Sequence, residues 1–224
     1  MPDDVPATPK ATPRRLPLGA LAAAALLAIP AYGFYYWGLS RIEVPPQKIA
    51  ILIQKTGLDL PNGHVMARTA DHKGIQLAIL KPGRHFRNPL FWEHELKPYH
   101  SVPQGHIGVL IRQYGETPSL SQNLLVPKEP NEKGEVFKGI VKEVLKPGDY
   151  PINPYAYHVE NHRAIEIKAG FVGVICNRVG ATPKTPNTYL VEVGERGVQR
   201  RVMRQGAHYL NPYEFQVFGV DIRS

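Results

Sequence analysis

Cysteine is nearly absent from this sequence: among 224 residues there is one, Cys176. No intramolecular disulfide can form, which fits a cytosolic protein as well as a disulfide-free extracytoplasmic one. Cys176 lies within the apolar run VGVIC, so its simplest interpretation is a small buried residue. No histidine that would activate it as a nucleophile can be placed beside it.

The sequence also lacks the short motifs of common enzyme classes. There is no P-loop, no GxGxxG between a strand and a helix, no GxSxG and no HExxH. Paired carboxylates occur, but none has a motif around it. We therefore predict that the protein is not an enzyme and that it has no catalytic residue, cofactor or metal site.

Nine histidines invite a metal hypothesis, but their spacing does not favour one. His158 and His162 are four residues apart, which serves zinc only on a helix, and the segment follows an Asn-Pro turn. The group Glu93-His94-Glu95 is similarly placed. His85 and His208 hold the same turn position in the first and third copies of a repeated pattern, and the second copy has Tyr150 there. A ring packed over the turn is therefore the favoured interpretation.

Glycine and proline, at 20 and 22 residues, are abundant but follow no G-X-Y period, which excludes collagen. They stand between short apolar runs, a pattern typical of turns between strands. No convincing amphipathic helix of three turns follows residue 40. The plentiful aromatic and aliphatic residues argue against global disorder.

The net charge of +8 comes from scattered basic residues with one local cluster. This cluster contacts either anionic lipid headgroups or an acidic neighbour, or it is a solvated strand face paired with Glu192 and Glu195. No nucleic-acid motif accompanies it, so we predict no nucleic-acid partner. The cluster consists of Arg196, Arg200, Arg201 and Arg204.

A segment without charge runs from Leu16 to Leu39. At about 1.5 Å per residue it is long enough for a hydrocarbon core of roughly 30 Å, and its last residues are aromatic, as at a membrane interface. We predict an uncleaved transmembrane helix over residues 16–39 after a disordered tail over residues 1–15. A cleaved signal peptide is the alternative, and Pro30 keeps a re-entrant hairpin open.

The flanking charges predict the orientation of this segment. Lys10, Arg14 and Arg15 precede it, while Arg41 and Lys48 follow. The excess on the amino-terminal side favours a cytoplasmic N-terminus. We therefore expect a single-pass membrane protein with the bulk of the chain on the extracytoplasmic side.

Three copies of one pattern fill the rest of the chain. A strand pattern that ends in glycine begins at Val44, Val102 and Ile167, and a turn pattern begins at Leu80, Leu145 and Met203. The strand patterns are 58 and then 65 residues apart, and the turns are 65 and then 58 apart. The copies therefore match at both ends, and the second carries a seven-residue insertion in its middle.

Each element of the pattern has a physical interpretation. The runs at Ile49–Ile53 and Ile107–Ile111 are apolar on both faces, which predicts strands covered on both sides. Lys-Pro-Gly suits a type II turn, and each Asn-Pro pair suits an Asx turn before another strand. Each copy has a small residue at the same position of its strand, namely Ala50, Gly108 and Gly173. A small residue there lets a neighbouring segment approach the backbone closely.

We therefore predict a mainly β fold: the transmembrane helix, then three tandem small antiparallel β-units that stack, over residues 44–101, 102–166 and 167–224. One unit is too small to bury a core alone, so stacking is expected. The middle loops, near residues 58–73, 116–138 and 181–196, are polar and are the natural partner-facing parts.

The pattern VPxGxxGVLxxxG … LxPGxHxxNP resembles the opening of band 7 (SPFH) domains, the family of stomatin, prohibitin and flotillin. The segments from Val102 to Val109 and from Leu80 to His85 match best, and Val220-Asp221-Ile222-Arg223 resembles the strand that follows. Tandem copies also resemble the β-repeats of the major vault protein. Such domains carry the hairpin once, before helices and a coiled coil, so the third unit is also a candidate start of an α+β SPFH domain.

The resemblance implies a membrane-bound scaffold that forms large homo-oligomers, with membrane lipid and a membrane protease or another membrane protein as candidate partners. The leading functional hypothesis is thus a non-catalytic scaffold that self-assembles and organises membrane complexes. The alternative is a monomeric adaptor that presents the middle loops to a protein or polysaccharide.

Overall fold

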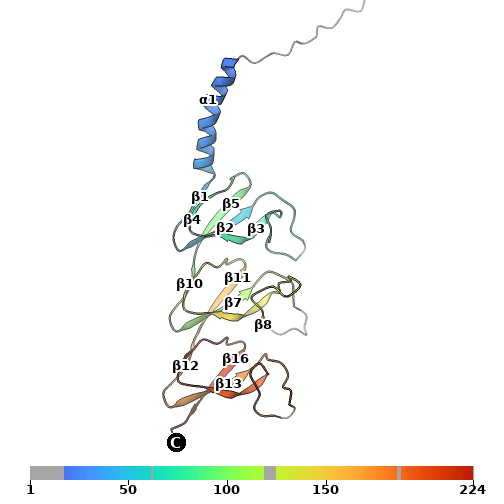
Figure 1. Ribbon diagram of the computed structural model, residues 1–224, viewed down its shortest axis with the longest axis vertical. Coiled ribbons are helices and arrows are strands. Elements are labelled where there is room, and N and C mark those ends of the chain that lie inside the picture. Colours follow the sequence, from blue (N-terminus) through green and yellow to red (C-terminus); the bar gives the residue numbers. More distant parts are fainter. Residues whose placement is uncertain (1–17, 62, 119–124, 186–187, 224) are drawn as a thin grey trace, which may run out of the picture.

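The computed structural model describes residues 18–223 except residues 62, 119–124 and 186–187. Helix α1 (Leu18–Phe34) and the π-helical turn η1 (Tyr35–Leu39) lead into three groups of strands that stack along one long axis (Figure 1). The predicted tail over residues 1–15 lies outside the described residues.

Strand pairing defines three units, which we name unit 1 (residues 41–98), unit 2 (residues 100–163) and unit 3 (residues 165–221). Unit 1 contains β1 (Arg41–Val44), β2 (Lys48–Gln54), β3 (Gly74–Leu80), β4 (Gly83–Phe86) and β5 (Trp92–Pro98). Unit 2 contains β6 (His100–Val102), β7 (His106–Arg112), β8 (Leu125–Val126), β9 (Gly139–Leu145), β10 (Gly148–Tyr150) and β11 (Tyr157–Arg163). Unit 3 contains β12 (Ile165–Ile167), β13 (Phe171–Asn177), β14 (Gly197–Met203), β15 (Gly206–His208) and β16 (Phe215–Asp221).

The three units share one topology. Each has a three-stranded antiparallel sheet whose middle strand is the apolar run: β3-β2-β5, β9-β7-β11 and β14-β13-β16. In unit 2 the short β8 adds to this sheet parallel to β9. Each unit also has a two-stranded antiparallel sheet, β1-β4, β6-β10 or β12-β15. In the part of the chain that the structure describes, the fold is thus mainly β, with 16 strands in several small, mostly antiparallel sheets.

The predicted transmembrane helix over residues 16–39 is wrong. Among the described residues, no helix is both long enough and apolar enough to span a membrane, and α1 has 17 residues. The α-helix stops at Phe34, and the aromatic residues that the sequence suggested as an interfacial belt begin to contact unit 1. The Tyr36 ring stacks on Phe86 at 4.8 Å between centroids, and the Trp37 ring lies 5.7 Å from it. The single-pass membrane location, which rested on this helix, is overturned with it.

The expectation that unit 3 begins an α+β domain is also wrong. Its described residues, 165–185 and 188–221, form strands, bends and turns without a helix. The reason is that unit 3 keeps the spacing of the other two units. Its middle strand β13 pairs with β16 over all seven residues, in the register that β2 and β7 use with β5 and β11.

Buried apolar residues form one cluster in unit 1 and one in unit 2, and further fully buried side chains lie on β2 and β7. In unit 1 the buried cluster comprises Ile42, Val44, Ala50 and Leu52. In unit 2 it comprises Leu110, Val126 and Val141, with half-buried neighbours such as Tyr157. Since a domain of about 60 residues buries a smaller share of its surface than a larger domain does, we expect contacts with neighbouring units to add to the stability of each unit.

One glycine position explains how the two sheets of a unit come together. A Cβ built at Gly108 in β7 would lie 3.0 Å from Val102 of the two-stranded sheet and 3.2 Å from both Leu145 and Val159. Unit 1 accepts Ala50 at this place, where it is fully buried. A small residue therefore lets the strand that leads into the unit cross close over the middle strand.

We expect the substitution Gly108→Val to lower the free energy of unfolding by about 1–3 kcal/mol, because a larger side chain overpacks this crossing. The measurement is urea unfolding followed by circular dichroism. Gly219→Val is the matched control, since a Cβ there meets its nearest atom at 3.8 Å. Equal effects of the two substitutions would contradict this account of the crossing.

Candidate interaction surface between stacked units

Each Asn-Pro turn is closed by the asparagine side chain. The Oδ1 atom of Asn153 accepts the backbone N–H of Tyr155 at 3.1 Å, and Asn211 and Asn88 form the same Asx turn with Tyr213 and Leu90. Because Oδ1 is used inside the turn, the amide nitrogen Nδ2 of each asparagine is left to donate elsewhere.

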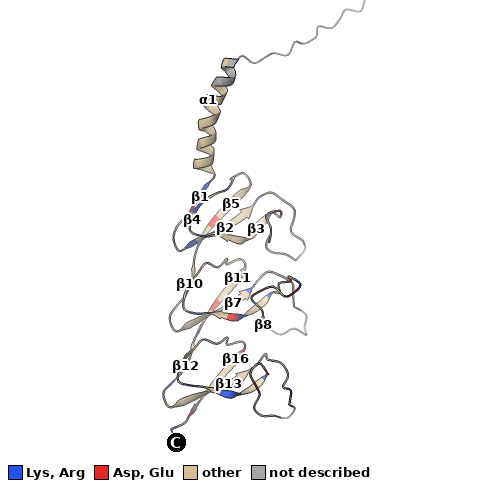
Figure 2. Ribbon diagram, viewed as in Figure 1, with Lys and Arg blue, Asp and Glu red and all other residues tan. Residues whose placement is uncertain are grey.

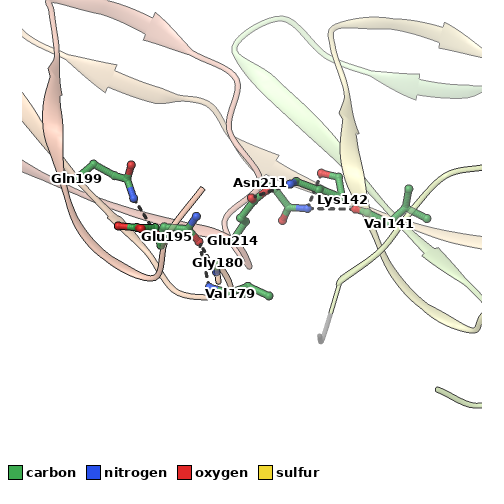
Figure 3. Close-up of polar contacts among 9 residues, drawn as sticks. Val141, Lys142, Val179, Gly180, Glu195, Gln199, Asn211 and Glu214 are labelled. Carbon is green, nitrogen blue, oxygen red and sulfur yellow. Dashed lines mark hydrogen bonds and ion pairs between the residues drawn. The ribbon is translucent and has the colours of Figure 1, made fainter. Parts of the chain in front are cut away.

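In units 2 and 3 this amide nitrogen donates to the preceding unit. Asn153 Nδ2 bonds to the carbonyl oxygens of Gln76 at 3.1 Å and Leu77 at 3.4 Å. Asn211 Nδ2 bonds to those of Val141 and Lys142, both at 3.1 Å (Figure 3). The two asparagines are 4% and 3% exposed. The same donor thus joins unit 1 to unit 2 and unit 2 to unit 3.

A β-bulge places the acceptor carbonyls. The pairing of β2 with β3 shifts between Ile51 and Ile53, so residues 76–78 of β3 lie opposite the single residue Leu52. The pairing of β7 with β9 shifts in the same place. A bulge bends its strand and leaves an extra residue out of the ladder. The acceptors of the asparagine lie in this irregular stretch of β3 and of β9.

A tyrosine and a glutamate form the second contact of each joint. The Tyr155 hydroxyl donates to Glu95 Oε2 at 2.8 Å, and the Tyr213 hydroxyl donates to Glu160 Oε2 at 2.7 Å. In the second joint the His162 ring also bonds to Glu160 and lies edge-on to Tyr213, with 5.8 Å between ring centroids. Both tyrosines come two residues after the asparagine, so the Asx turn that the asparagine closes also positions the tyrosine of the joint.

These bonds shift the titration of both partners. The Tyr213 hydroxyl, and next the His162 ring, hold the pKa of Glu160 below its ordinary value of 4.5. The same bond raises the pKa of Tyr213 above its ordinary value of 10.0. In the first joint, Lys97 and then Tyr155 lower the pKa of Glu95.

The third contact differs between the two joints. Lys142 Nζ of unit 2 lies 3.3 Å from Glu214 Oε1 of unit 3, whose side chain is buried. In the joint of units 1 and 2, the corresponding places hold Leu77 and the fully buried Ala156. One joint therefore uses an ion pair where the other uses small apolar groups.

A cavity of about 340 Å³ lies where unit 1 meets unit 2, with Leu77 and Ile79 on one side and Leu110 and Tyr157 on the other. The Tyr114 and Tyr157 hydroxyls are 3.0 Å apart at this cavity. Burial, and next this hydrogen bond, raise the pKa of Tyr114 to about 12. The Tyr114 hydroxyl therefore stays neutral at physiological pH.

The histidines singled out from the sequence are not brought together as a metal site. His158 and His162 lie on β11, and four residues along a strand span about 13 Å. Among the described residues there is no group of three or more side chains placed to hold a metal ion. Residues Glu93, His94 and Glu95 follow one another along β5, so their side chains alternate between its faces.

The repeated turn position packs its ring back over the turn. His85 Nε2 lies 2.9 Å from the carbonyl oxygen of Lys81, and His208 Nε2 lies 2.9 Å from that of Arg204. The Tyr150 hydroxyl donates to Lys146 O at the same distance. All three rings serve the fold of the turn.

The arginine cluster and the cysteine lie in unit 3. Arg200 pairs with Glu192 at 3.1 Å, while Arg201 and Arg204 border a cavity of about 780 Å³ in unit 3. Lys and Arg are otherwise spread along all three units (Figure 2). Cys176 is half-buried in β13.

Comparison with protein-family models, with curated proteins and with solved structures found no match. Sequence reasoning found the Asn-Pro turns but missed their outward amide and the Tyr–Glu pair. The available signal was the tyrosine two residues after asparagine in two of the three copies, together with Glu95 and Glu160 in matching strands.

The substitution Asn211→Asp should weaken the chain strongly. It keeps the oxygen that closes the turn but sets a carboxylate against the carbonyls of Val141 and Lys142. We expect a loss of about 2 kcal/mol or more in the free energy of unfolding, measured in urea. Asn88→Asp is the matched control, because no unit precedes unit 1 in the described chain. A comparable loss in both would show that the turn, not the joint, is responsible.

The Tyr213–Glu160 bond predicts a dependence on pH. Because the folded pKa of Glu160 is lowered, the bond stabilises the fold above the unfolded pKa and is lost as pH falls through the folded value. Tyr213→Phe should therefore destabilise the chain by about 1 kcal/mol near pH 7, allowing for partial exposure, and by less below pH 4. Thermal unfolding of this variant and of the exposed control Tyr189→Phe tests it; a pH-independent difference contradicts it.

Proposed function

We propose that the protein is a non-catalytic scaffold, a rod of stacked β-units that associates with further copies of itself. The observation that carries the proposal is the joint, built twice with the same atoms: an asparagine amide on two carbonyls and a tyrosine on a glutamate. A module that stacks on its own kind within one chain has the surfaces needed to do so between chains.

The alignment of the units supports a structural role. The joints carry side-chain contacts from one unit to the next and hold the units in one line (Figure 1). Such an arrangement suits a spacer or a subunit of a larger assembly. The resemblance to band 7 domains points the same way, and it stays a prediction, as do the lipid and protease partners that it implies.

The adaptor hypothesis is favoured by one observation. The middle loops expose several large apolar side chains that no described residue covers, most of all in unit 3, where Tyr189 is 94% exposed. Leu58 in unit 1 is exposed in the same way. A protein partner that binds these loops would leave the ends of the rod free and the chain monomeric.

Self-association is tested by sedimentation velocity over a range of concentrations. The scaffold proposal expects species larger than the 25.0 kDa chain, whose proportion rises with concentration. Electron microscopy of the same samples should show particles several units long. A chain that sediments as one monomer up to high micromolar concentration would contradict the scaffold and leave the adaptor.

A further inference from the structure

Each joint has two sides, which we define by their residues. The lower face of a unit carries the acceptor carbonyls of β3, β9 or β14 and the residue of β5, β11 or β16 that holds the position facing the tyrosine. The upper face carries the asparagine of the Asn-Pro turn and the two residues after the proline. Within the described chain, the upper face of unit 1 and the lower face of unit 3 meet no other unit.

The lower face of unit 3 differs from the other two in polarity. Strand register places Phe218 opposite Val174, as Glu95 lies opposite Ile51 and Glu160 opposite Val109. Phe218 thus replaces the glutamate, and it is 51% exposed. Val220, also exposed, stands where the other units have Lys97 and His162. The acceptor positions are kept, by Gln199 and Arg200.

The upper face of unit 1 shows the matching change. Leu90 stands two residues after Asn88, where units 2 and 3 have Tyr155 and Tyr213, and it is 69% exposed. The next residue, Phe91, is exposed as well. Asn88 keeps the Asx turn of its counterparts. It is half-buried, whereas its two counterparts are fully buried by the preceding unit.

Both members of the Tyr–Glu pair are therefore replaced, one at each end of the rod, and both replacements are apolar. A tyrosine hydroxyl suits a carboxylate, and a leucine suits a phenylalanine, whereas leucine against glutamate would remove the hydroxyl donor and set an apolar side chain against a carboxylate. The two ends fit each other and fit the inner faces less well.

We propose that the lower face of unit 3 binds the upper face of unit 1 of a second copy of this chain, head to tail. Leu90 packs on Phe218, and the Asn88 amide donates to the carbonyls of Gln199 and Arg200. The inference rests on the proposed self-association and specifies its surfaces. Because the two surfaces differ, the contact does not close on itself, and repetition gives a filament.

Helix α1 leaves unit 1 at the end that this joint uses (Figure 1). The joint therefore requires α1 to lie beside the neighbouring copy instead of along the axis of the stack. The described side-chain packing of η1 on unit 1 includes Tyr36 and Trp37 on Phe86 and Arg84 over the Trp37 ring, while Ser40, which follows η1, is buried and accepts the Arg87 N–H at 2.8 Å. Since the aromatic side chains and Arg84 are all at least partly exposed, turning the helix aside breaks few contacts.

Two single variants of the full chain, Leu90→Glu and Phe218→Glu, test the two faces. Each should raise the dissociation constant of self-association at least tenfold in sedimentation velocity. Leu58→Glu, an equally exposed leucine away from both ends, is the control and should change it less than twofold. If both end variants associate like the unaltered chain while that chain still forms oligomers, the head-to-tail joint is overturned and the scaffold proposal stands.

A mixture of the two variants separates head-to-tail binding from other modes. Leu90→Glu keeps an intact lower face and Phe218→Glu keeps an intact upper face, so together they should form a dimer of one of each and nothing larger. If Leu90→Glu alone still associates, the contact joins two lower faces and the proposal fails. If the mixture stays monomeric, the proposal also fails.

The double variant Leu90→Tyr with Phe218→Glu recreates the inner pair at the ends. It should associate within threefold of the unaltered chain, although Phe218→Glu alone does not. Asn88→Asp provides an independent variant, since it should weaken association without altering urea unfolding of the monomer. If the double variant does not recover self-association and Asn88→Asp does not weaken it, the head-to-tail joint is overturned. If the unaltered chain is monomeric, both this joint and the scaffold proposal are overturned.

Discussion

The stack depends on the asparagine of each Asn-Pro turn, because one side chain closes a turn and holds two units together. Its oxygen accepts from the backbone two residues on, and its nitrogen donates to two carbonyls of the unit before it. The orientation of the turn and the orientation of the neighbouring unit are thus set by the same amide plane. A buried amide left unpaired would be destabilising, so the turns of units 2 and 3 are stable in full only when the preceding unit is in place.

The β-bulge supplies the other half of this constraint. In a regular ladder the carbonyls of β3 and β9 would alternate between their own neighbours, and a buried asparagine would find no pair of acceptors. The shift opposite Leu52 and Leu110 frees a stretch of backbone at the lower side of the unit. The irregular strand is therefore what allows a buried side chain of one unit to bind the backbone of the next.

The strands and the turns of each unit could be predicted from the sequence. The contacts between units and the end of the helix could not, because they depend on residues far apart in the chain. The glycine and proline spacing predicts strands such as β2 and β7, and the small residue at position 108 predicts a close crossing, since these are local effects. The end of α1 could not be predicted in this way. Tyr36 and Trp37 belong to an uninterrupted apolar segment, and their stacking on Phe86 joins residues about fifty positions apart. Likewise, the Tyr155 hydroxyl reaches Glu95 across a joint that no local pattern describes.

The joints share the asparagine and tyrosine contacts, but their third contacts differ. This difference disfavours a stack in which a unit binds the wrong neighbour. At the third contact, unit 2 offers Lys142 to Glu214, whereas unit 1 offers Leu77 to the place of Ala156. A stack shifted by one unit would set Leu77 against Glu214 and bury a carboxylate without its cation. The Glu214 side chain is buried while that of Lys142 is 60% exposed, so the loss of this cation would leave a buried carboxylate unpaired and destabilise the shifted stack. Variation within a repeated joint therefore selects one arrangement among several that share the same turns, and the end faces extend the same rule beyond a single chain.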